Sequence, residues 1–150
     1  MASGGAMPRN FKLLEEYDAA IGKEGKSLVT GKHAGLIQYG VDEERDDPLL
    51  HHWRGIIIGP QESHIGQFMY TVAIEATDNY PTEAPIVHFI EPKIKMPAVD
   101  DRGRVTLSKL EPKLIWNPSL NIADVLMAIR ENMYKESVSK ASGNLQGTSY

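Results

Sequence analysis

Four apolar segments of strand length follow one another between residues 36 and 90, and they constrain the fold more than any other feature of the chain. In the third segment, Phe68, Tyr70 and Val72 are separated by Met69 and Thr71. This period of two is typical of a half-buried strand. Charged residues and prolines lie between the segments and suit solvated connections between strands. The four segments, residues 36–41, 53–58, 68–75 and 86–90, therefore predict an antiparallel meander.

Two helices are predicted on either side of these segments. Asn10 is a good N-cap, and apolar residues recur at helical spacing after it, namely Leu13, Leu14, Tyr17 and Ile21. Glycines and lysines then interrupt the pattern, so residues 22–35 are expected to form a long loop or a hairpin. A second helix is expected over residues 121–135, where one face is apolar: Ile122, Val125, Leu126, Ile129 and Met133. This helix should cover one face of the sheet, which makes the chain an α+β domain.

Composition argues against several classes of function. The 150 residues carry 16 basic and 20 acidic side chains, with a net charge of −4 and no strongly basic face of the kind that nucleic acid requires. Without cysteine there is no disulfide and no thiolate metal cluster, and a cytosolic or nuclear location is expected. No apolar run is long enough for a membrane span, and the first residues lack a secretory signal. The five histidines show no ligand spacing, so no metal or other cofactor is expected.

The segment around Thr106 has the surroundings of a catalytic cysteine without the cysteine. Its flanking residues include Met96-Pro97-Ala98, Gly103 and Trp116, and they follow the order and spacing of the ubiquitin-conjugating enzyme fold, which the chain resembles. In that family, a His-Pro-Asn triplet ends eight positions before the nucleophile. Ala98 and Thr106 stand at the asparagine and cysteine positions of this pattern, so both catalytic positions are replaced.

The double replacement predicts an inactive member of the family. A thioester needs a sulfur that is partly thiolate, and a threonine hydroxyl is a weak nucleophile unless a base activates it. Ala98 also has no side-chain donor that could stabilise an oxyanion. The resemblance, to ubiquitin-conjugating enzyme variants, covers about residues 8–137. It implies a variant domain over residues 9–137 without the last helices of active members, between flexible tails at 1–8 and 138–150.

The opening segment, residues 8–16, is similar to the variants that partner the conjugating enzyme specialised for lysine sixty-three-linked chains. The resemblance implies a heterodimer in which Phe11 sits in a pocket of the active partner, flanked by Arg9, Asn10 and Leu14. It also implies a place in the ubiquitin conjugation pathway and in DNA damage tolerance. The alternative is that Phe11 packs beneath its own sheet. A single apolar anchor at a helix start favours the interface, because binding energy concentrates in a few such residues.

The same resemblance implies that the acceptor ubiquitin binds non-covalently on the outer face of the first strands, at Gln38, Ile56 and Met69. Alternation supports this independently, since Met69 points outward if Phe68 and Tyr70 point into the core. The alternative is a pair of scattered surface apolar residues, which are common. Holding ubiquitin beside the partner's thioester would make amine attack nearly intramolecular and would select the attacking lysine.

The chain departs from the family in length, and two other functions remain open. The stretch between Tyr17 and Tyr39 is longer by about eight residues, which would lengthen the first helix or insert a hairpin near the partner-binding end. One further residue is present within residues 90–92. The first alternative function is a true conjugating enzyme that uses Thr106 or Ser108. The second is a ubiquitin- or peptide-binding sorting module with no conjugating partner.

Overall fold

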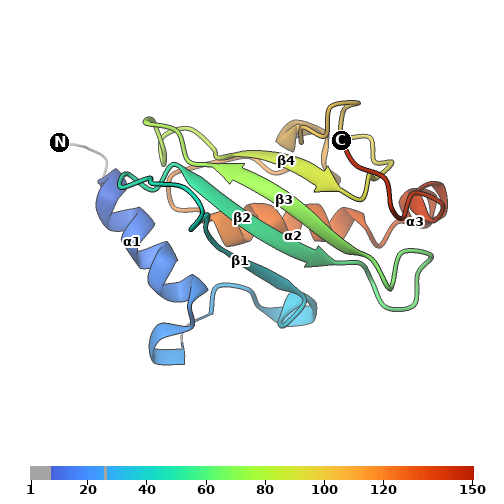
Figure 1. The fold of residues 1–150 in the computed structure, drawn as a ribbon, viewed down its shortest axis with the longest axis horizontal. Coiled ribbons are helices and arrows are strands. Elements are labelled where there is room, and N and C mark those ends of the chain that lie inside the picture. Colours follow the sequence, from blue (N-terminus) through green and yellow to red (C-terminus); the bar gives the residue numbers. More distant parts are fainter. Residues whose placement is uncertain (1–7, 26) are drawn as a thin grey trace.

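The computed structural model describes residues 8–25 and 27–150 as a sheet with helices beside it and behind it (Figure 1). The predicted flexible tail at residues 1–8 lies outside this part of the chain except for Pro8. The main elements are α1 (Arg9–Ala20), β1 (Ile37–Val41), β2 (His52–Ile58), β3 (Met69–Glu75), β4 (Ile86–Glu91), α2 (Ile122–Asn132) and α3 (Glu136–Ser142). Single 3₁₀ turns occur at Lys23–Gly25, Gly31–His33 and Leu107–Lys109. Among the described residues, no helix is long and apolar enough to cross a bilayer.

The predicted antiparallel meander is confirmed. The strands are hydrogen-bonded in the order β1-β2-β3-β4, and every neighbouring pair is antiparallel. The pairing of His52 with Glu75 sets β2 against β3, and the register with β4 shifts between Thr71 and Val72. Because side chains alternate along each strand, this register assigns one set of side chains to the core and the other to the outer face.

The core lies between the sheet and α2. Tyr70, Val72 and Ile74 of β3 are almost completely buried, as their alternation predicts. They pack with apolar residues of α2, which crosses behind the sheet in Figure 1. Burial of each such side chain contributes about 1.5–3 kcal/mol. The predicted apolar face of the second helix is confirmed, with Ile122, Val125, Leu126, Ile129 and Met133 all inaccessible to solvent.

The first helix begins at Arg9, and its N-cap lies two residues before the predicted cap. Pro8 precedes it and Asn10 lies in its first turn, so the expected Asn10 cap is wrong. Proline has no backbone N–H, and the N–H groups at the start of a helix have no partner within the helix. Proline is therefore compatible with this position. Leu13 is fully buried, whereas Leu14 and Ile21 are 52% and 60% exposed. The apolar residues of α1 therefore do not form one core-facing stripe.

The predicted flexible tail at residues 138–150 is wrong, because this segment is folded against the domain. It contains most of α3, in which Val138 and Ser142 are buried. Three backbone N–H groups between β4 and the vacated site are satisfied from it: Lys95 by the Ser142 hydroxyl at 2.9 Å, Lys93 by the Thr148 hydroxyl at 3.0 Å, and Ile94 by the Tyr150 hydroxyl at 3.2 Å. Small polar residues resemble a solvated tail in sequence, but here their hydroxyl groups are acceptors in a packed segment.

Candidate functional site

The start of α1 carries an apolar surface that the core does not use. Phe11 is 63% exposed and Leu14 is 52% exposed, and they lie one helical turn apart. The alternative in which Phe11 packs beneath its own sheet is therefore excluded. An exposed phenylalanine beside an exposed leucine is the kind of feature that marks an interaction site when it is rimmed by polar residues. Phe11 and Leu14 are called the helix-start surface below.

Arg9 was predicted to contact the partner beside Phe11, but its guanidinium is engaged within the domain. It donates hydrogen bonds to the carbonyl oxygens of Leu49 at 2.6 Å, Ala76 at 2.8 Å and Thr77 at 2.9 Å. These carbonyls belong to the β1–β2 loop and to the loop that leaves β3. Arg9 therefore ties two loops to the beginning of α1, while Asn10 stays exposed.

The opposite side of α1 is fixed by a buried carboxylate that sequence reasoning missed. Glu16 is 1% exposed, and it accepts hydrogen bonds from the Tyr80 hydroxyl and from the backbone N–H of Ile122 at 2.6 Å. Burial raises the pKa of Glu16 above its usual value, although both hydrogen bonds favour the charged form. The carboxylate joins α1 to the β3–β4 loop and to the start of α2. Its position four residues after Lys12 gave no signal of this role.

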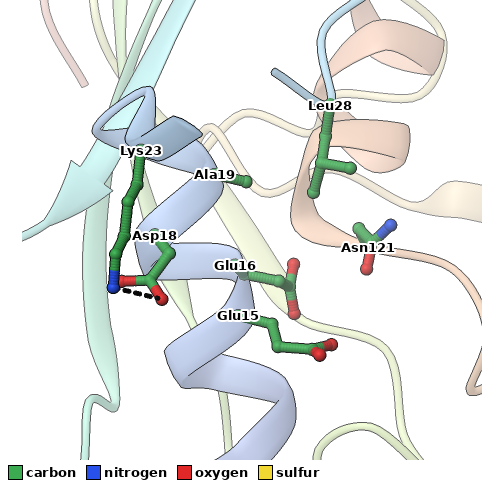
Figure 2. A pocket seen from close by; sticks show the side chains of 7 residues that line it. All are labelled: Glu15, Glu16, Asp18, Ala19, Lys23, Leu28 and Asn121. Carbon is green, nitrogen blue, oxygen red and sulfur yellow. Dashed lines mark ion pairs between the residues drawn. The ribbon is translucent and has the colours of Figure 1, made fainter. Parts of the chain in front are cut away.

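A pocket of about 440 Å³ lies beside Glu16 at the far end of α1 (Figure 2). Glu15 and Glu16 extend from α1 toward Asn121, and Leu28 faces them from the following loop. Lys23 forms an ion pair with Asp18 at 3.7 Å. No group of three metal-binding side chains occurs here or elsewhere among the described residues.

The outer face of the sheet brings together the three residues predicted to bind the acceptor ubiquitin. Gln38 pairs directly with Ile56, Ile56 pairs with Thr71, and Met69 pairs with Ile58. Met69 is 59% exposed, which confirms that it points outward. A shallow hollow of about 450 Å³ runs across Gln38, Ile56 and Thr71. Gln38, Ile56 and Met69 are called the outer-face surface below.

The vacated catalytic positions also meet in space. The backbone N–H of Thr106 donates to the carbonyl of Ala98 at 2.7 Å, and the neighbouring residues Val99 and Val105 form a β-bridge. Ala98 is buried and Thr106 is exposed. Within residues 8–25 and 27–150, no histidine or carboxylate side chain hydrogen-bonds the Thr106 hydroxyl. In this part of the chain, the hydroxyl therefore has no hydrogen-bonded base of the kind that activates a nucleophile.

Two neighbouring histidines form a cluster with Asp47. β2 begins at His52, so the alternation of side chains along the strand does not extend to His51. Each ring has its Nδ1 atom 3.2 Å from a carboxylate oxygen of Asp47. The other ring nitrogen of His51 lies 2.6 Å from Asp78. This hydrogen bond raises the pKa of His51.

The insertion between Tyr17 and Tyr39 lies at the end of the sheet remote from the helix-start surface. Its Lys32 forms an ion pair of 2.7 Å with Glu131 of α2, and its His33 lies 3.1 Å from the buried guanidinium of Arg130. Arg130 also donates to the carbonyl of Ile58 at 2.8 Å, at the end of β2 that is farther from His52. The expectation of a longer helix or a hairpin near the partner-binding end is therefore wrong.

Comparisons with known proteins agree with the fold. The family profile described as ubiquitin-conjugating enzyme matches residues 21–146. The chain is 30% identical over 145 residues to ubiquitin-conjugating enzyme spm2 of Schizosaccharomyces pombe, covering 96% of this chain and 97% of that protein. It is 29% identical over 127 residues to ubiquitin-conjugating enzyme variant MMS2 of Saccharomyces cerevisiae, covering 85% of each. The solved structure of human ubiquitin-conjugating enzyme E2 G1 shares the fold at a TM-score of 0.62 and 22% identity, covering 86% of this chain and 98% of that one.

Proposed function

The chain belongs to the ubiquitin-conjugating enzyme family, and from that premise we propose that it is a non-catalytic variant which pairs with an active conjugating enzyme. The observation that carries the proposal is the vacated catalytic position. The sequence contains no cysteine, Ala98 replaces the asparagine donor, and the exposed hydroxyl of Thr106 has no hydrogen-bonded base among the described residues. The similarity to variant MMS2 supports the same role.

The proposed partner contact is the helix-start surface. Phe11 and Leu14 are both exposed, and burying their apolar side chains against a partner would be favourable. Phe11 is the larger of the two side chains. Aromatic anchors of this kind supply most of the binding energy in many protein interfaces. The partner would contribute the thioester, because this chain has no sulfur nucleophile.

The proposed cargo contact is the outer-face surface, which would hold the acceptor ubiquitin. Its hollow across Gln38 and Ile56 is shallow and open, which suits a weak contact that is released after each cycle. Orientation of the acceptor beside the partner's thioester would raise the rate of amine attack and would direct it to lysine sixty-three. Effective concentrations gained by such positioning are large when the reacting atoms are aligned.

Chain assembly tests this proposal directly. The domain is mixed with activating enzyme, ATP, ubiquitin and the conjugating enzyme specialised for lysine sixty-three-linked chains, and products are resolved with linkage-specific detection. We expect diubiquitin of that linkage only when the domain is present, with the thioester on the partner and no ubiquitin adduct on this chain. A covalent adduct on this chain would overturn the non-catalytic role. No stimulation with any partner, together with retained ubiquitin binding, would favour the sorting module.

A further inference from the structure

We propose that Leu49, in the β1–β2 loop, is a second contact for the conjugating-enzyme partner, and that Arg9 positions it beside the start of α1. The inference rests on the proposed function and extends the helix-start surface beyond the helix. Leu49 is 53% exposed, which is as much as Leu14. Nothing in the strand pattern required a large aliphatic side chain at this position, because it lies outside the sheet.

The backbone around Leu49 is held in an unfavourable conformation. Leu50 has φ of 57°, and no other non-glycine residue in the described part of the chain has a positive φ. A left-handed backbone at a leucine persists only where surrounding contacts enforce it, and such positions cluster at functional sites. The conformation lets Leu50 pack against the core while Leu49 stays in solvent. The loop therefore separates two adjacent leucines into a structural one and an exposed one.

Several hydrogen bonds enforce this conformation. The Trp53 indole N–H donates to the carbonyl of Leu50 at 2.8 Å, and the N–H of Leu50 donates to the carbonyl of Asp47 at 3.0 Å. The guanidinium of Arg9 donates to the carbonyl of Leu49 at 2.6 Å while it also holds the loop after β3. His51 adds a link between the two loops through Asp78. A loop held in this way presents Leu49 with little ordering cost on binding.

Leu49 and the helix-start surface lie at the same end of the domain. Arg9 contacts the Leu49 carbonyl and is two residues from Phe11, so both side chains lie at the same end of α1. In Figure 1 the β1–β2 loop reaches the beginning of α1. A stable interface covers about 800 Å² on each partner, which is wide enough to include both.

The charges around Leu49 define the chemistry of the partner. Residues 42–47 contain five carboxylates and one arginine, and Glu43, Glu44 and Asp46 are exposed. The single arginine, Arg45, already faces Asp42 at 3.3 Å. A partner that covers Leu49 would therefore present an apolar patch flanked by basic side chains. We assign this surface to the same conjugating enzyme that receives Phe11.

The test is a binding series against the purified lysine sixty-three-specific conjugating enzyme, measured by calorimetry with the full chain. Leu49→Ser should weaken binding about tenfold, since buried contact residues near an anchor reach this range. Ile21→Ser is the matched control, because Ile21 is 60% exposed at the other end of α1. The Ile21→Ser variant should bind the partner as tightly as the wild type. Phe11→Ala reports on the proposed function itself. Thermal unfolding verifies that each variant is folded.

Arg9→Ala tests the positioning role through a double-mutant cycle. If Arg9 acts by holding Leu49, the double variant Arg9→Ala with Leu49→Ser should bind no more than about twofold more weakly than Leu49→Ser alone. Additive losses would show that Arg9 does not act through Leu49.

Loss of binding in Phe11→Ala with none in Leu49→Ser would overturn this inference and leave the proposed function intact. Unchanged binding in both would overturn the proposed interface. Self-association that Leu49→Ser abolishes, with unchanged partner affinity, would assign the surface to a second copy of the chain.

Discussion

The helix-start surface and the outer-face surface are both partly apolar, but they are built in different ways. Phe11 and Leu14 project from the first turns of a helix, and the loop held by Arg9 lies at the same helix end. Gln38 and Ile56 are paired residues of a sheet, and the hollow that they line is shallow. A projecting aromatic side chain can fill a pocket and lose all its water, whereas a flat sheet face keeps a hydrated rim.

This difference in shape predicts a difference in affinity. A projecting anchor suits a long-lived heterodimer, and a flat patch suits a ubiquitin that must leave after each reaction. The two surfaces also belong to separate elements, α1 on one side and β1 to β3 on the other. Substitutions at one surface should therefore leave the other intact.

The largest expected effect is that of Phe11→Ala on partner affinity. Removal of the aromatic ring should weaken binding about 100-fold, or roughly 2.7 kcal/mol, because the exposed ring is the largest apolar group on the helix-start surface. Calorimetry against the partner measures the loss. Ubiquitin affinity should be unchanged in the same variant. A parallel loss of ubiquitin binding would mean that the two surfaces are not independent.

A smaller effect is expected from Ile56→Asp on ubiquitin binding. A carboxylate in the centre of the outer-face surface should weaken ubiquitin binding about tenfold, because the charge must be desolvated against an apolar contact. Titration of isotope-labelled ubiquitin, followed by NMR, gives the affinity. Ile115→Asp is the matched control, because Ile115 is an isoleucine 72% exposed and outside both surfaces. Equal losses in the two variants would remove the outer-face surface from the proposal.

The smallest expected effect is a pH dependence confined to the helix-start surface. The hydrogen bond to Asp78 raises the pKa of His51, and a further bond to Asp47 acts in the same direction against burial and the charge of Arg9. A raised pKa in the folded state means that the stabilisation is complete below the unfolded value of about 6.5 and is lost as the pH rises through the folded value.

Loss of the proton from His51 weakens its bond to Asp78, which helps to hold the loop that presents Leu49. Between pH 6 and pH 8.5, partner affinity should therefore fall by up to about threefold, the range of a solvent-exposed ion pair. Calorimetry at several pH values measures this change in buffers of matched ionic strength. His51→Gln should flatten the profile while keeping one hydrogen bond. Ubiquitin affinity of this chain should not follow the same profile. A profile unchanged by His51→Gln would assign the dependence to another group.

Local pattern was sufficient for the strands and for the buried face of α2. Period-two alternation in residues 68–75 and period-3.6 spacing in residues 122–133 each reflect how one element meets the core, so they can be read from neighbours in sequence. The assignment of Ala98 and Thr106 to the two vacated positions also followed from sequence, through the family pattern, whereas their contact in space came from the structure. The 3₁₀ turns of the insertion and the fold of residues 138–150 could not be predicted in this way. Their contacts are made with α2 and with residues 93–95, which are distant in sequence.

The sequence by itself determined the meander, the helix that covers it, and the absence of a sulfur nucleophile, because each depends on residue identity or on spacing within one segment. Only the tertiary structure decided that Arg9 faces inward and that Leu49 faces outward. It also decided that Glu16 is a buried link rather than a surface charge. These outcomes depend on carbonyl, hydroxyl and N–H groups that come from segments 40 to 106 residues away. Such partners carry no periodicity, since any residue can supply a backbone group and the Tyr80 hydroxyl comes from a distant loop, and so no local pattern reveals them.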